Sequence, residues 1–150
     1  MFRGKDQQDA HELLLILMEY LHQDVNLVRR KVKIPEQKND NIPEIKAAEN
    51  AWEMEKLADQ SFIRETFYGQ QRSTLTCPHC GWSSVTYESF FELPLKLPNG
   101  NKRCSVAQLI ETYLSRDHVP YKCPTCKKER QCSKQFEIVK LPLILTVSLG

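Results

Sequence analysis

Two Cys-x-x-Cys pairs constrain the fold of this 150-residue chain more than any other feature of its sequence. The first pair is Cys77 and Cys80, the second is Cys123 and Cys126, and each pair lies between strand-like segments. A strand that turns back on itself at such a pair directs two thiolates at one point, so two such turns complete a tetrahedral four-sulfur site. We therefore predict one structural zinc ion bound by these four cysteines. A site of this kind is closed and leaves no position for a catalytic water.

Other interpretations of the cysteines are weaker. Two unconnected turns with free thiols are the first alternative, and a thioredoxin-like redox pair is the second, although neither pair follows a βαβ pattern at a helix start. The remaining cysteines, Cys104 and Cys132, stand alone and are expected to be ordinary buried or surface thiols. His79 lies inside the first pair, and we expect it to be a solvent-facing turn residue and not a ligand.

Composition limits the classes of function. The net charge is +2 and the mean hydropathy is −0.50, with 41% hydrophobic residues, which excludes a wholly disordered chain and a collagen. No apolar run approaches the ~20 residues of a membrane-spanning helix, so we expect no membrane insertion. A zinc ribbon that binds nucleic acid is also disfavoured, because so small a charge offers little counterion release. A short basic cluster at residues 127–130 is more simply a solvated turn.

Hydrophobic periodicity predicts an α+β fold. An amphipathic helix is expected over residues 6–26, capped by Asp6, with Asp9 and Glu12 placing negative charge in its first turns. A loop follows over residues 29–41, where periodicity is lost. Further helices are predicted over residues 45–59, 61–66 and 105–115, the last with a capping box formed by Ser105 and Gln108, and strands over residues 72–77, 83–93, 119–122, 131–140 and 143–149.

The order of these motifs resembles the ubiquitin-specific protease family, cysteine proteases that act as deubiquitinases. The segments that carry the resemblance are Phe2-Arg3-Gly4, Gln7-Gln8-Asp9-Ala10-x-Glu12, Leu21-His22-x-Asp24-x-Asn26, Phe67-x-Gly69-Gln70, both cysteine pairs, Tyr87-Glu88-x-Phe90-x-x-Leu93-x-Leu95 and Leu141-Pro142-x-x-Leu145. The resemblance implies a thumb–palm–fingers fold with zinc-pinned antiparallel β fingers. Residues 1–28 would then be the thumb helix, 29–44 a linker, 45–66 helical, and 67–150 the fingers and part of the palm.

The same resemblance implies that ubiquitin and ubiquitinated proteins are the partners. It matches Asp9 and Glu12 to the positions that hold ubiquitin's arginine-rich tail, where carboxylates pair with guanidinium groups. The alternative is that both residues only favour the helix dipole. Charge reversal at Asp9 is expected to weaken ubiquitin binding while leaving helicity intact.

The catalytic part of the family pattern is not matched. In this family the nucleophile lies in a cysteine box before the thumb helix, and the catalytic histidine lies in a box after the last strand. We assign no catalytic role to His11, His22, His79 or His118. We therefore expect a fragment of a deubiquitinase catalytic domain that is inactive by itself and exposes apolar surface. The alternative is a catalytically dead, zinc-stabilised ubiquitin-binding module. Because no signal peptide is expected, we predict a reducing, intracellular compartment, where paired cysteines more often bind metal than form disulfides. A cytoplasmic or endosome-associated location is what the resemblance implies.

Overall fold

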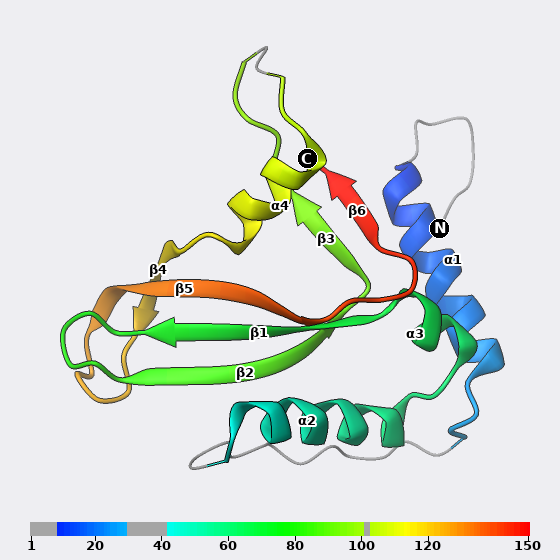
Figure 1. Ribbon diagram of the computed structural model, residues 1–150, viewed down its shortest axis with the longest axis horizontal. Coiled ribbons are helices and arrows are strands. Elements are labelled where there is room, and N and C mark those ends of the chain that lie inside the picture. The colour runs from blue at the N-terminus through cyan, green and yellow to red at the C-terminus, as the bar shows by residue number, and fades with distance from the viewer. Residues whose placement is uncertain (1–8, 30–41, 101–102) are drawn as a thin grey trace.

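The computed structural model describes residues 9–29, 42–100 and 103–150. It contains four helices and six strands among these residues, and the α+β class predicted from the sequence is confirmed (Figure 1). In chain order they are α1 (Ala10–Val25), α2 (Glu44–Ala58), α3 (Phe62–Phe67), β1 (Gly69–Thr76), β2 (Ser83–Phe90), β3 (Glu92–Leu95), α4 (Val106–Leu114), β4 (Asp117–Lys122), β5 (Glu129–Lys140) and β6 (Thr146–Leu149). Most of the predicted loop, residues 30–41, lies outside the described residues.

Four strands form one antiparallel sheet in the order β2-β1-β5-β4. The β1–β2 hairpin closes at the pair Thr76 and Ser83, and the β4–β5 hairpin closes at the pair Lys122 and Glu129. Because β1 and β5 are antiparallel neighbours, both turns lie at the same end of the sheet, on the left in Figure 1. We call this end the fingertip, residues 77–82 and 123–128. The topology therefore brings two turns that are distant in sequence side by side.

The strand predicted over residues 83–93 is divided in two. β2 stays in the large sheet as far as Phe90, which pairs with Gly69, whereas β3 forms a parallel pair with β6. Gly69 is required at this junction, since a Cβ there would collide with the Phe90 ring and lie 2.7 Å from the Lys140 carbonyl oxygen. The predicted strand over residues 143–149 likewise begins late, at Thr146, because only its last residues pair with β3.

Helix α2 lies along β2 and covers one face of the sheet (Figure 1). Its buried side is formed by Ala47, Ala48, Ala51 and Trp52. The buried Gln70 amide donates to the Ala48 carbonyl at 2.9 Å, which joins the helix to β1. Small residues allow this close approach, so the alanine spacing explains where the helix sits.

Helix α4 and strand β3 form the main apolar core, in which Phe90, Leu93, Leu95 and Leu109 are buried. The predicted capping box is confirmed: the Ser105 hydroxyl accepts from the Gln108 amide, and the Gln108 side chain accepts from the Ser105 amide. This box fixes the start of α4 where its apolar side meets β3.

Helix α1 begins at Ala10, later than predicted, and its N-cap is Asp9, whose carboxylate accepts from the His11 amide at 2.8 Å. The expected cap, Asp6, lies outside the described residues. Of the α1 residues only His22 is buried. Its apolar side chains are largely exposed: Leu13, Leu14, Leu15, Leu17, Tyr20, Leu21 and Val25. Among the described residues no helix is long and apolar enough to cross a bilayer.

Candidate metal centre

Both fingertip turns have the same backbone design. In the first turn the Cys77 amide donates to the Trp82 carbonyl and the Gly81 amide donates to the Cys77 carbonyl, at 2.8 and 3.0 Å. In the second, the Cys123 amide donates to Lys128 and the Lys127 amide donates to Cys123, at 3.1 and 2.8 Å. Gly81 and Lys127 occupy equivalent positions and both have positive φ, 72° and 57°. Each turn is thus a tight loop that directs its two cysteines to the same side.

The four predicted cysteines meet at the fingertip. The sulfur atoms of Cys77, Cys80, Cys123 and Cys126 all lie within 4.8 Å of one another. The Cys77–Cys126 sulfurs are 4.0 Å apart and the Cys80–Cys123 sulfurs 3.6 Å apart. A tetrahedron with Zn–S bonds of about 2.3 Å has edges of about 3.8 Å, so the observed separations fit a four-thiolate zinc site. The alternative of two unconnected turns is wrong.

The electrostatics of the cluster also favour a cation. The pKa of the Cys77 thiol is lowered to about 6, mainly because the Cys80 backbone N–H donates to its sulfur. The pKa of Cys126 is raised to about 12, mainly because its thiol hydrogen bonds to Cys80 and is desolvated. Without a cation, Cys126 therefore keeps its proton while Cys77 ionises easily, so these two sulfurs are not charged together near neutral pH. A divalent metal removes this conflict by stabilising all four thiolates.

Cys104 and Cys132 were expected to be ordinary buried or surface thiols, and the structure has one of each kind. Cys132 is fully buried against Cys77 and Cys123, and burial raises the pKa of its thiol. Cys104 is exposed, at the start of α4. Neither belongs to the group of four sulfurs.

Side chains around the cluster link the two turns. The Trp82 and Tyr121 rings stack at 5.8 Å between centroids with an interplanar angle of 4°. His79 is exposed, as predicted, but its Nδ1 lies 3.5 Å from the Cys126 sulfur. Sequence reasoning missed this contact, because it joins two turns whose pairing is decided by the sheet.

The predicted acidic residues lie at the other end of the molecule. Glu12 is exposed in the first turn of α1, and Asp9 is exposed but engaged as the N-cap. The neighbouring His11 contacts Glu92 of β3, with 2.7 Å between Nε2 and Oε2. The structure therefore places Asp9 and Glu12 where α1 approaches β3, and it does not bring them to the cysteines.

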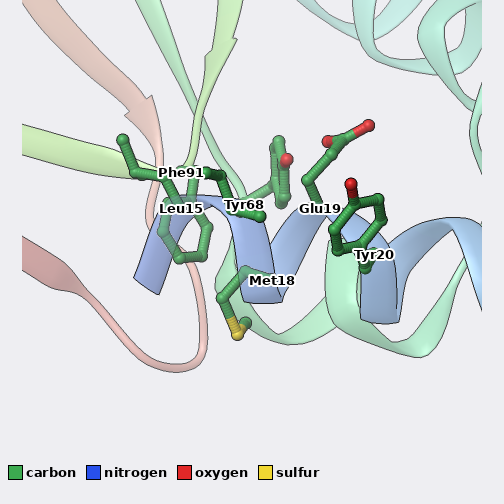
Figure 2. Close-up of a pocket in the computed structure, with 7 residues that line it drawn as sticks. Leu15, Met18, Glu19, Tyr20, Tyr68 and Phe91 are labelled. Atoms are coloured by element: carbon green, nitrogen blue, oxygen red, sulfur yellow. The ribbon is translucent and has the colours of Figure 1, made fainter. Parts of the chain in front are cut away.

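A shallow apolar groove lies along α1 on the side of Tyr68 and Phe91 (Figure 2). Its volume is about 420 Å³, and its α1 lining is Leu15, Ile16, Met18, Glu19 and Tyr20. Burial raises the pKa of Tyr68. His22, the buried residue of α1, is structural: its Nδ1 is 2.7 Å from the Ser61 hydroxyl and its Nε2 3.3 Å from Asp59.

Comparison with known families decides the relationship. The family model described as ubiquitin carboxyl-terminal hydrolase matches residues 1–150, which is the whole chain. This chain belongs to the ubiquitin carboxyl-terminal hydrolase family. The resemblance inferred from the motifs is confirmed, and with it membership of a deubiquitinase family of hydrolases.

Family members from distant organisms align with the chain. Ubiquitin carboxyl-terminal hydrolase Usp2 of Drosophila melanogaster is 33% identical over 156 residues, covering 99% of this chain and 16% of that protein. Ubiquitin carboxyl-terminal hydrolase 2 of Gallus gallus is 32% identical over 154 residues, covering 99% of this chain and 43% of that protein. A hydrolase of Arabidopsis thaliana, the putative ubiquitin carboxyl-terminal hydrolase 11, is 37% identical over 119 residues, 79% of this chain and 13% of that protein. The chain therefore spans less than half the length of these hydrolases.

Solved structures support the fold. The structure of the SAGA Ubp8/Sgf11/Sus1/Sgf73 DUB module bound to ubiquitin aldehyde matches with a TM-score of 0.58 at 24% identity, covering 98% of this chain and 28% of that one. A second structure of this DUB module, with a variant Ubp8 and a shortened Sgf11, matches with a TM-score of 0.62 at 24% identity, covering 97% of this chain and 29% of that one. The α+β fold with antiparallel fingers is thus shared with these chains.

Proposed function

We propose that this chain forms the zinc-pinned fingers of a thiol-dependent deubiquitinase, together with part of the surface that receives ubiquitin's tail. The observation that carries the proposal is the four-sulfur cluster that closes two hairpins at one end of a sheet, in a chain matched throughout by the hydrolase family. The reaction of the whole enzyme is hydrolysis of the bond after ubiquitin's C-terminal glycine. Ubiquitin and ubiquitinated proteins are the partners.

The proposed role of the metal is structural. Cys77, Cys80, Cys123 and Cys126 hold one zinc ion, which when bound cross-links the β1–β2 and β4–β5 hairpins. Four thiolates leave no open position on the ion, so it activates no water. Rigid hairpins would hold the fingers in one shape for a folded partner.

Asp9 and Glu12 are the proposed contacts for ubiquitin's arginine-rich tail. Both carboxylates are exposed near the N-terminus of α1, and the adjacent His11 reaches Glu92 of β3, so α1 and β3 approach each other here. A basic segment entering between them would meet carboxylates from the helix, and arginine pairs with carboxylates in bidentate geometry. In this division residues 1–28 belong to the thumb, 29–44 to a linker, 45–66 to a helical part, and 67–150 to the fingers and palm.

Catalysis is proposed to require residues other than those described. Within residues 9–29, 42–100 and 103–150, the contact between a cysteine and an imidazole is that of Cys126 with His79. The sulfur of Cys126 is a proposed zinc ligand, and metal coordination leaves it a poor nucleophile. The apolar side chains exposed on α1 are then the surface against which further protein of the catalytic domain packs. We expect this chain alone to bind ubiquitin weakly and not to hydrolyse a fluorogenic ubiquitin amide.

A charge-removing variant tests the tail contact. The structure corrects the expectation that charge reversal at Asp9 leaves the helix intact, because Asp9 caps α1 and arginine cannot accept the His11 amide. Asp9→Asn keeps a good N-cap and removes only the charge, and Glu12→Gln does the same without touching the cap. We expect the double variant to bind ubiquitin about tenfold more weakly by isothermal titration calorimetry, with unchanged circular dichroism.

Ubiquitin truncated before its C-terminal tail is the matched ligand. The wild-type chain and the double variant are expected to bind this truncated ubiquitin equally. Equal affinity of both chains for intact ubiquitin would reject Asp9 and Glu12 as tail contacts. Turnover of the fluorogenic amide by the 150-residue chain would reject the assignment of catalysis to other residues.

A further inference from the structure

Hydrogen-bond donors are unevenly distributed over the four sulfurs. The backbone N–H groups of Cys80 and His79 are directed at the buried Cys77 sulfur and lower the pKa of its thiol. The buried Cys123 receives the backbone N–H of Cys126 at 3.4 Å. The second cysteine of each pair lies toward solvent, with Cys80 exposed and Cys126 half-buried. The backbone of each turn therefore supports its first sulfur, and the second sulfur depends on other groups.

The two sulfurs that lie toward solvent, those of Cys80 and Cys126, differ in their contact with an imidazole. The imidazole of His79, in the first turn, places Nδ1 at 3.5 Å from the sulfur of Cys126, in the second turn. The equivalent residue of the second turn is Thr125, and within the described part of the chain it makes no such contact with Cys80. The contact thus crosses between the hairpins in one direction only.

We propose that His79 is a positioning residue of the metal centre, whose Nδ1–H donates to the Cys126 sulfur and holds that sulfur as a ligand. This inference rests on the proposed zinc site. A metal-bound thiolate carries no proton and can only accept, so the imidazole must be the donor and its proton must be on Nδ1. Nε2 then faces solvent, since His79 is exposed.

The bond has two consequences for the centre. Four thiolates and one Zn²⁺ carry a net charge of −2, and an N–H donor disperses the part of that charge that resides on Cys126. Dispersed charge makes the sulfur less reactive toward electrophiles. The bond also links the first turn to a ligand in the second turn, so it resists separation of the two hairpins when a chelator competes for the metal. Removing a group that hydrogen-bonds to a metal ligand typically lowers metal affinity by about 10–100-fold.

Zinc release from the full 150-residue chain tests the proposal. The zinc-loaded chain is mixed with an excess of a chromophoric chelator, and release is followed by absorbance. His79→Ala is expected to release zinc about tenfold faster than the wild type, the lower end of the range for an exposed donor. His79→Asn retains an N–H donor at the place of Nδ1 and is expected to restore the wild-type rate. Thr125→Ala, the matched change in the other turn, is expected to have no effect.

Alkylation mapping provides a readout that loss of folding does not mimic. The loaded chain is treated briefly with iodoacetamide, and the modified cysteines are located by mass spectrometry. In His79→Ala we expect faster modification of Cys126 with Cys80 unchanged. Equal release and equal Cys126 modification in the wild type and His79→Ala overturn the role of His79. A wild-type chain that binds no zinc overturns the zinc site itself, which is a distinguishable result.

Discussion

The fingertip and helix α1 differ in what they bury: the fingertip buries cysteine side chains, whereas α1 leaves most of its leucines exposed. At the fingertip Cys77 and Cys123 are fully buried, and backbone hydrogen bonds close both turns. In α1 the leucines are mostly exposed, and the one buried residue is a histidine. The fingertip groups its thiols around a place for a cation, whereas among the described residues the apolar side chains of α1 remain largely exposed. Order at the fingertip should depend on metal, and order in α1 should depend on packing.

The largest expected effect comes from removing a buried ligand. Cys123→Ser is expected to lose the zinc ion and the hydrogen-exchange protection of the fingertip ends of β1, β2, β4 and β5, because structural zinc contributes directly to folding. Mass-spectrometric hydrogen exchange measures this, with α1 as the internal reference. Cys104→Ser, at an exposed cysteine outside the cluster, is the control and should change neither quantity. Loss of protection in α1 as well would break the comparison between the two regions.

An intermediate effect is expected at the buried residue of α1. His22→Ala removes the hydrogen bonds to Ser61 and Asp59, and an unmade buried hydrogen bond costs about 1–3 kcal/mol. The free energy of unfolding, measured by urea titration of the helical circular dichroism signal, should fall by this amount. His118→Ala, at an exposed histidine of β4, is the control. Zinc content should stay constant in both variants. An unchanged unfolding free energy in His22→Ala would show that the His22 hydrogen bonds do not stabilise the packing of α1.

The smallest expected effect concerns the aromatic pair beside the cluster. Tyr121→Ala removes the stack with Trp82 and should cost about 0.5–1.5 kcal/mol beyond the lost area. Tyr121→Phe retains the ring and should behave as the wild type. Tryptophan fluorescence during thermal unfolding, measured in a Trp52→Phe background so that Trp82 is the only tryptophan of the chain, reports the change locally. If both variants unfold alike, the stack adds nothing to the fingertip.

Local signals in the sequence predicted much of this structure. The spacing of Cys77, Cys80, Cys123 and Cys126 predicted a shared site, and the structure brings their sulfurs together. Ser105 and Gln108 predicted the start of α4, since a capping box involves residues only three positions apart. The bounds of α2 were predicted to within one residue at each end. In each case the deciding contacts are short-range or follow from one motif.

Features that depend on tertiary pairing were not predicted. The division of a long strand into β2 and β3 follows from the switch of partner from β1 to β6, which no local pattern near Phe91 encodes. The N-cap predicted at Asp6 is a local error: the apolar pattern begins at Ala10, and the structure has Asp9, directly before it, in that role. The contact of His79 with Cys126 required knowing that the two turns are neighbours.

Zinc content is the measurement that tests the account most directly. The chain is produced in zinc-supplemented medium, purified without chelators, and analysed for metals by inductively coupled plasma mass spectrometry against protein concentration. The account predicts one zinc ion per chain in the wild type and none in Cys123→Ser. A wild-type chain without zinc, whose fingertip nevertheless remains protected from hydrogen exchange, would contradict it.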